Sequence, residues 1–421
     1  MKPIFKQYEN GLRLIFKKVE STRPASLYIV VDAGSYKETE KNNGISHFIE
    51  HLTFKGTENR TAKQISTELE EIGANANAYT SKYTTCYFAT CLNEKMENCF
   101  DILSDIVFNS KYSQSDIDKE RQVIFEEIDM YDDDPESVAY EQFCKDFYAG
   151  SPLERPIIGT KEILEGITKK DIEEYVKENY IPQNIVVSVV GNFTLAYVEK
   201  LVKKYIGKRF TKKADIIEKN KSMVVIPDKK FSFIKKDIAQ THIVIGFPCD
   251  NIFTDKRMAY TLFGFIFGAG MGSRLFQKVR EENGLVYSIS CVPELFVCGG
   301  DVVISLATNK KNQLKAMELV KQEIDKLVSD GFTEAELNRA KTFCKTLIVS
   351  GTETGSSMAK SNANNILTFN RIISVEERLQ KVESVTVEEL NELAVKVFNY
   401  GNVCGCVVSK DPDENIFNVF N

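Results

Sequence analysis

Histidine is scarce in this sequence, with three among 421 residues, and basic residues are not in excess. The formal net charge of −6 and the pI near 5.5 argue against a nucleic-acid-binding role, which usually needs a basic face. No hydrophobic run approaches the length of a membrane span, and the N-terminal residues lack the apolar stretch of a signal peptide. These absences predict a soluble, cytoplasmic protein that contacts neither nucleic acid nor membrane. A mature organellar protein without its transit peptide would have the same features.

The ten cysteines include no C-x-x-C pair. The Cys404-Gly405-Cys406 segment is a weak indication of metal or redox chemistry, and burial of alternate residues in a strand explains it better. We therefore expect most cysteines to be reduced, buried and packed as small hydrophobic residues in a reducing compartment.

Two of the three histidines lie four residues apart, in His47-Phe48-Ile49-Glu50-His51. On a helix, residues i and i+4 share one face, so two imidazoles can bind one cation. Histidine nitrogens are favoured zinc ligands, and a catalytic zinc keeps one position open for water. Glu50 projects beside the same site, where a carboxylate can accept the water's proton. The pattern predicts a hydrolytic zinc site with His47 and His51 as ligands and Glu50 as the base.

The flanking residues favour a helix for this motif. Ser46 is a candidate N-cap. Phe48, Ile49 and Leu52 are apolar, as expected for a helix that buries its other face. The helix is predicted to end near Gly56.

A third zinc ligand is expected from a charged helix that runs from Asp116 to about Tyr131. Glu120 and Glu127 are seven residues apart, so they share one face, and one could bind the metal while the other orients a ligand. These patterns do not choose between Glu126 and Glu127 as the ligand. Alternatively, the charged side chains of this helix form a solvated face and bind no metal.

The segment from Gly44 to Thr57 resembles the zinc motif of the M16 metallopeptidases, the family of pitrilysin, insulin-degrading enzyme and the mitochondrial processing peptidase. In that family the third ligand is a glutamate of an E-R-x-V-I-x-x-E segment, which corresponds here to the residues from Glu120 to Glu127. The resemblance implies that Glu127 is the third Zn²⁺ ligand and that Glu120 supports the ligands from behind. The similarity is greatest to the short, processing-peptidase-like branch.

Two further segments resemble family elements. Asn77, Ala78 and Tyr79 match an edge strand that pairs with bound peptide. The segment from Arg280 to Tyr287 matches an R-x6-Y element that completes the active site from the other half of the chain. The resemblance implies that Tyr287 donates a hydrogen bond to the substrate carbonyl oxygen and that Arg280 contacts the substrate.

The chain is expected to be built from two similar halves, since the order of expected strands and helices recurs. The segment 167–172 resembles 385–390, and the apolar strand at 185–190 has a counterpart at 403–408. A lysine-rich linker, 203–226, places the boundary near residue 215, which gives an N-terminal catalytic domain (1–215) and a C-terminal domain (216–421). Each half is expected to be α+β, a mainly antiparallel sheet covered by helices. The family resemblance adds that the halves form a clam-like chamber.

The second half has no histidine pair. We interpret 268–275 as its counterpart of the zinc motif, and Thr346-Leu347 stands near the place of Glu127. One half would then carry the chemistry while the other helps to bind substrate. His242 is expected to be an ordinary strand histidine, and the acidic segment 132–136 is either a solvated turn or a rim that favours basic peptides.

Together these features predict a zinc endopeptidase that acts on short or unfolded polypeptides, with a homodimer as the expected assembly. Two alternatives stay open. The chain could be the active subunit of a heterodimeric processing peptidase, or a non-catalytic M16-like structural subunit.

Overall fold

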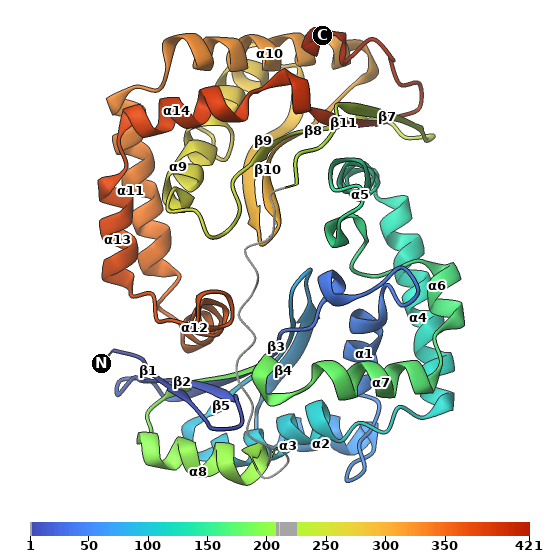
Figure 1. Ribbon diagram of the computed structural model, residues 1–421, viewed down its shortest axis with the longest axis vertical. Coiled ribbons are helices and arrows are strands. Elements are labelled where there is room, and N and C mark those ends of the chain that lie inside the picture. The colour runs from blue at the N-terminus through green and yellow to red at the C-terminus, as the bar shows by residue number, and fades with distance from the viewer. Residues whose placement is uncertain (1, 208–209, 211–224) are drawn as a thin grey trace. The chain divides into compact units, whose positions relative to one another are not determined.

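A computed structural model of the chain describes residues 2–207, 210 and 225–421 (Figure 1). It divides into two compact units, each made from three stretches of sequence. The first unit comprises Met1–Ile128, Arg155–Glu218 and Val349–Val375, and the second comprises Asp129–Glu154, Lys219–Ile348 and Glu376–Asn421. The boundary predicted near residue 215 lies outside the described residues.

The first unit is built on a six-stranded sheet in which only β2 and β6 pair in parallel. In sheet order its strands are β1 (Ile4–Gln7), β2 (Arg13–Lys18), β6 (Ile185–Gly191), β3 (Pro24–Val31), β5 (Thr85–Leu92) and β4 (Asn75–Thr80). The turn between β1 and β2 lies at Asn10-Gly11, where Gly11 has a φ of 87° and the Asn10 side chain accepts a hydrogen bond from the Leu12 amide.

Residues of β3 alternate between two hydrophobic clusters, as the two-residue period of a strand requires. Leu27 and Ile29 face a core shared with most of the unit's helices, whereas Tyr28 and Val30 face a smaller cluster on the opposite side. The helices that contribute residues to the larger core are α1 (Ile45–Thr53), α2 (Ala62–Glu71), α3 (Met96–Phe108), α4 (Gln114–Asp133, in this unit up to Ile128), α6 (Lys161–Gly166), α7 (Lys169–Asn179) and α8 (Leu195–Tyr205).

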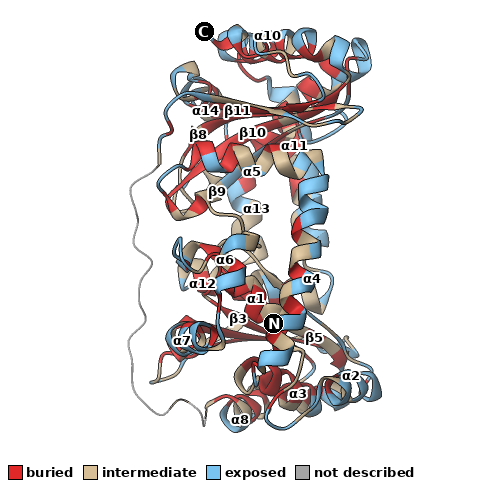
Figure 2. Cartoon of the chain, turned by 90° about the vertical axis from the view of Figure 1, so that its right-hand side faces the viewer, coloured by how far each residue is buried: buried red, intermediate tan, exposed pale blue. Residues whose placement is uncertain are grey.

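The second unit is built on a five-stranded sheet in which only β7 and β11 pair in parallel. In sheet order its strands are β7 (Lys230–Lys235), β11 (Cys404–Ser409), β8 (Thr241–Cys249), β10 (Gly299–Thr308) and β9 (Val286–Phe296). Its helices are α5 (Pro135–Phe147), α9 (Arg257–Phe267), a π-helix at Phe276–Glu282, α10 (Gln313–Asp330), α11 (Glu334–Ser350), α13 (Val375–Ser384) and α14 (Val387–Val397). The inner strands of both sheets are buried (Figure 2).

The two sheets repeat one topology, which supports the predicted duplication and α+β class. In both, a parallel pair is followed by three antiparallel neighbours, so β2, β6, β3, β5 and β4 correspond to β7, β11, β8, β10 and β9. The helix that follows β3 is α1, and the helix that follows β8 is α9. The counterpart of the zinc motif is therefore α9 and not the segment 268–275, which connects α9 to the π-helix.

Each sheet receives one covering helix from the other half of the sequence. Helix α12 (Gly355–Phe369) packs on β2, β6 and β3 of the first unit, and α5 packs on β7, β8 and β11 of the second. On α12, Met358 and Ile366 join the smaller cluster around Tyr28. On α5, the Phe143 ring lies against Gly246, where a Cβ would come within 2.3 Å of the ring. The amphipathic pattern of these helices did not reveal which sheet they cover.

The remaining sequence expectations concern surface and core residues. All ten cysteines are buried and free, as predicted. In the acidic segment 132–136, Asp134 is the N-cap of α5 and accepts a hydrogen bond from the Ser137 amide at 3.0 Å. His242 lies half-buried on β8. Among the described residues, none of the helices combines the length and apolar character needed to cross a membrane.

The packing of α12 should contribute measurably to the stability of the first unit. Ile366 is fully buried against the sheet, so Ile366→Ala should lower the free energy of unfolding by about 2–5 kcal/mol. The neighbouring Asn364 is exposed, and Asn364→Ala should change it by less than about 0.5 kcal/mol. Denaturant unfolding followed by circular dichroism measures both variants. Equal stabilities would show that α12 does not support this sheet.

Candidate metal centre

Helix α1 presents the H-x-x-E-H motif on its less buried side. Ile45, Phe48, Ile49 and Leu52 are buried in the core, whereas the motif's polar side chains are only partly buried. This is the amphipathic arrangement that the spacing predicts.

The start of α1 differs from the prediction. The N-cap is Gly44, which has a φ of 92° and no side chain that could cap the helix. Ser46 lies within the first turn instead, and its hydroxyl hydrogen-bonds to the Tyr175 hydroxyl at 2.8 Å. The helix ends at Thr53, before the predicted stop at Gly56.

The missing cap is replaced by a buried carboxylate from upstream. Glu38 accepts hydrogen bonds from the amides of Gly44 at 2.7 Å and Ser46 at 2.9 Å, and from the Asn43 side chain at 2.8 Å. A negative group is favoured at a helix N-terminus, where the first amides have no partner within the helix. Burial raises the pKa of Glu38, and these hydrogen bonds oppose that rise. Nothing in the local sequence marks Glu38 as the cap.

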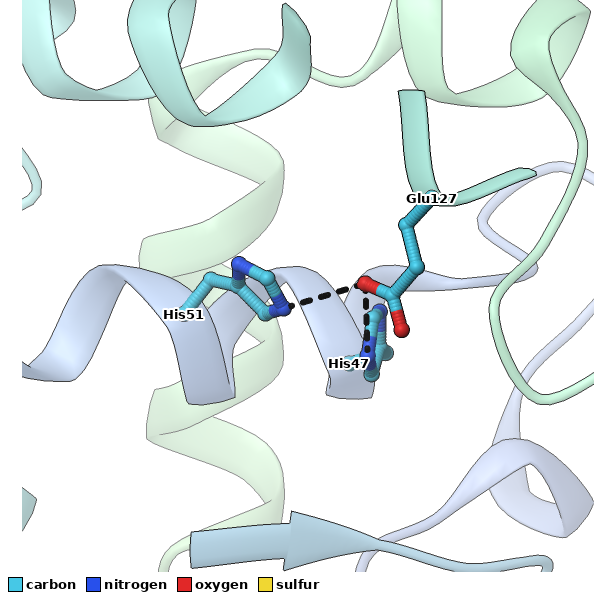
Figure 3. Close-up of side chains that lie close together, drawn as sticks. All are labelled: His47, His51 and Glu127. Atoms are coloured by element: carbon cyan, nitrogen blue, oxygen red, sulfur yellow. Dashed lines mark ion pairs between the residues drawn. The ribbon is translucent and has the colours of Figure 1, made fainter. Parts of the chain in front are cut away.

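The third side chain of the centre comes from α4. One carboxylate oxygen of Glu127 lies 3.8 Å from His47 Nε2 and 3.5 Å from His51 Nε2 (Figure 3). One ligand atom from each residue falls within 4.8 Å of the others, which makes this a group that could hold a metal ion. Glu126, the alternative that the sequence left open, is exposed.

These separations fit a tetrahedral zinc. With bonds of about 2.0–2.1 Å, neighbouring ligand atoms lie about 3.3–3.4 Å apart, close to the distances between Glu127 and the two rings. The donor set of two imidazoles and one carboxylate is also one that catalytic zinc sites use.

His47 is suited to a metal because it is held neutral. Burial, and secondarily the neighbouring His51, lowers the pKa of His47 to about 4. Its contact with Glu127 is therefore not an ion pair at neutral pH, although the atoms are close. A neutral imidazole has the free lone pair that metal binding needs.

Glu120 lies behind the His51 ring, as the resemblance implies. One Glu120 oxygen is 3.4 Å from His51 Nδ1, and the other forms an ion pair with the Lys55 ammonium at 2.8 Å. Glu120 is buried, so its carboxylate can fix the orientation of the ring whose other nitrogen faces Glu127.

Arg121, the neighbour of Glu120, fixes α4 against the rest of the unit. Its guanidinium donates to the carbonyl oxygens of Leu164 at 3.0 Å and Ile167 at 2.7 Å, and it lies over the Phe48 ring at 5.7 Å. The residue therefore links α4 to α1 directly. The sequence motif contains this arginine, but its spacing alone assigns it no role.

Glu50 is separate from the group of ligand atoms. Its carboxylate accepts a hydrogen bond from the Thr80 hydroxyl at 2.6 Å. Burial raises the pKa of Glu50, and the Thr80 hydrogen bond opposes the rise. Thr80 is the last residue of β4, and no sequence pattern marks it as part of the site.

Asn77, Ala78 and Tyr79 lie on β4, which is one of the two edge strands of the first sheet. Ala78 packs on the side of the larger core, whereas the Tyr79 ring joins the smaller cluster on the opposite face. The edge position agrees with the resemblance; peptide binding there stays a prediction.

Arg280 and Tyr287 lie in the second unit. The Arg280 guanidinium lies over the Phe276 ring at 4.8 Å within the π-helix, and Tyr287 on β9 is 58 % exposed. Strand β9 is one of the two edge strands of its sheet and corresponds to β4. The parts assigned to these two residues in catalysis stay predictions.

Comparison with known families gives two matches along the chain. The model of insulinase (peptidase family M16) matches residues 13–161, and the model of the peptidase M16 inactive domain matches residues 166–343. The first match contains all three side chains of the candidate metal centre.

Relatives with similar sequences extend over most of the chain. A protein of Mycobacterium leprae is 32 % identical over 92 % of this chain and 88 % of its own length, and one of Bacillus subtilis is 31 % identical over 93 % and 94 %. Both are described as uncharacterized zinc proteases.

Solved structures share the fold. A peptidase M16 inactive domain from Pseudomonas fluorescens has a TM-score of 0.90 and 17 % identity, covering 98 % of this chain and 99 % of its own. A protease from Helicobacter pylori has a TM-score of 0.89 and 21 % identity, covering 97 % and 99 %. With the family matches and the similar relatives, these findings show that the chain belongs to peptidase family M16.

Proposed function

We propose that this chain is a zinc-dependent endopeptidase that hydrolyses peptide bonds in short or unfolded polypeptides. The observation that carries the proposal is the grouping of His47, His51 and Glu127 with a fourth carboxylate, Glu50, that is not part of the ligand set. A purely structural metal site would have no need of such a carboxylate.

In this proposal each side chain of the site has a separate role. His47, His51 and Glu127 hold Zn²⁺, and Glu120 fixes the His51 ring. When bound, zinc would polarise the scissile carbonyl and lower the pKa of a water molecule. Glu50 would accept the water's proton and return it to the leaving amine, a role favoured by its raised pKa. The Thr80 hydroxyl occupies one Glu50 oxygen, which leaves the other oxygen for the proton.

The substrate would bind by strand addition to β4. In the described part of the chain β4 pairs only with β5, so the backbone groups along its outer edge lack a strand partner. A peptide that pairs there gains main-chain hydrogen bonds, which depend weakly on its sequence. Asn77, Ala78 and Tyr79 would provide this edge. Because Thr80 follows directly, the bound backbone would run close to Glu50.

We also propose, from the family motif, that Tyr287 donates to the substrate carbonyl oxygen and that Arg280 contacts the substrate. The second repeat carries neither histidines nor acidic residues on α9, so its contribution would be to binding. We propose a cytoplasmic homodimer, because one chain contains both the zinc motif and the R-x6-Y element. The active subunit of a heterodimer is the alternative assembly. The match to the inactive-domain family model, with one solved structure described as such a domain, makes a non-catalytic subunit the third option.

Activity and metal content of the purified chain test this proposal. The wild-type protein should hydrolyse members of a quenched peptide library and contain about one zinc per chain by elemental analysis. Glu50→Gln should keep the zinc and lose hydrolysis, because Glu50 handles protons. Glu127→Gln should lose the zinc, because it removes a charged ligand.

Glu126→Gln is the matched control, since it makes the same change one residue away on an exposed side chain. It should retain both zinc and activity. A chain that becomes active only with a distinct homologue supports the heterodimer, and a zinc-loaded chain without activity in any assembly supports the structural subunit. If Glu126→Gln empties the site while Glu127→Gln does not, the ligand assignment is wrong.

The role of Tyr287 makes a separate prediction. Removing a single donor that stabilises transition-state charge typically lowers turnover by about 10²–10³-fold. Tyr287→Phe should therefore lower kcat on this scale, leave KM within a few-fold and leave bound zinc unchanged. Ser288→Ala, an exposed neighbour on the same strand, is the control and should have wild-type kinetics. An unchanged kcat in Tyr287→Phe would remove Tyr287 from the mechanism.

A further inference from the structure

Helix α12 brings one cation to the edge strand. Lys360 is the only charged residue in the α12 sequence, and its ammonium lies 4.7 Å from the centre of the Tyr79 ring on β4. The helix itself packs over the inner strands β2, β6 and β3. Lys360 therefore extends from the helix toward the edge of the sheet that we propose to bind peptide.

The surface below Lys360 is aromatic and uncharged. Tyr79 contacts Phe88 with ring centres 6.2 Å apart, and Phe88 stacks on Tyr28 at 4.9 Å. The Tyr28 hydroxyl hydrogen-bonds to Ser356 on α12 at 2.6 Å, which fixes the helix over this layer. Asn77 lies on the same face of β4 as Tyr79, because residues two apart in a strand point to the same side of the sheet.

The Lys360 ammonium has spare hydrogen-bonding capacity. Over the residues that the structure describes, the Lys360 ammonium forms no ion pair. Its contact with the Tyr79 ring is a cation–π contact, in which no oxygen accepts a hydrogen bond from the ammonium. A lysine ammonium has three donors, so a carboxylate can bind it while the ring contact persists.

Strand geometry brings a substrate side chain to this point. An added strand lies about 4.8 Å from β4, and its side chains alternate between the two faces of the sheet. Side chains on one face point toward the α1 side, where Thr80 holds Glu50, and those on the other point toward α12. A residue opposite Tyr79 has its Cβ about 4.5–5.5 Å from the Tyr79 Cβ, within reach of the ammonium.

We propose that Lys360 selects a carboxylate side chain, Asp or Glu, at the substrate position that faces α12 beside Tyr79. The inference rests on the proposed peptidase function and adds a substrate class to it: peptides with an acidic residue at this position. It also gives α12 a second role, because a helix that covers the sheet then determines specificity at its edge.

Peptide binding tests the proposal without depending on turnover. The probes are fluorescent ten-residue peptides, acetylated and amidated, in which one Glu or Gln is moved along an otherwise uncharged sequence. In the Glu50→Gln variant, the peptide with Glu at one position should bind about 5-fold more tightly than the peptide with Gln there, which is the upper range for an exposed ion pair. At the other positions the Glu and Gln peptides should bind equally well. Lys360→Met should remove this preference, Lys360→Arg should retain it, and Lys360→Glu should disfavour Glu at that position.

Lys170→Glu is the control for net charge, because Lys170 is 81 % exposed on α7. It should leave the preference unchanged. A Glu preference that persists in Lys360→Met, or equal binding of Glu and Gln peptides at every position, would overturn the proposal. Selective binding combined with an inactive wild-type protein would support Lys360 and contradict the endopeptidase. Hydrolysis without any Glu preference would support the endopeptidase and contradict the role of Lys360.

Discussion

The ligand atoms of His47, His51 and Glu127 converge on one point although they come from helices that are distant in the sequence. Several contacts maintain this convergence. The buried Glu38 carboxylate holds the first turn of α1, and Arg121 holds α4 to the loop after α6 and to Phe48 on α1. Because a metal site tolerates little displacement of its ligands, these contacts matter for holding α1 and α4 in position.

The duplicated topology places the candidate metal centre in one of the two units. Both sheets have the same strand order and the same single parallel pair, but only α1 carries the motif, and α9 is almost wholly apolar. The exchange of α5 and α12 means that neither half of the sequence completes its own sheet. Cutting the chain near residue 215 would therefore leave a hydrophobic sheet face without its helix in each fragment.

The local motifs could be predicted from the sequence because short spacings determine them. The four-residue spacing of His47 and His51 requires only a helix, and the hairpin at Gly11 requires only turn chemistry. The choice of Glu127 over Glu126 needed the family resemblance, since adjacent residues on a helix differ only in direction. Ser46 was wrongly predicted as the N-cap because a serine before an apolar run usually has that role.

Long-range contacts could not be predicted in this way. Glu38 and Thr80 each act on α1 from another element, and no sequence period relates them to it. The same holds for α12, whose amphipathic pattern requires a hydrophobic partner without specifying which sheet provides it. The counterpart of the zinc motif is α9 and not the expected 268–275, because the strand order identifies it and no local pattern does.

Three side chains from α1 and α4 are expected to hold one zinc while Glu50 stays outside its coordination. Anomalous diffraction at the zinc absorption edge, on crystals of the zinc-loaded full chain, tests it most directly. We predict a single strong peak within about 2.0–2.2 Å of His47 Nε2, His51 Nε2 and a Glu127 oxygen, with the Glu50 carboxylate still bound to Thr80. A peak coordinated by Glu50 or Glu120 in place of Glu127, or no peak at these residues, would contradict the account.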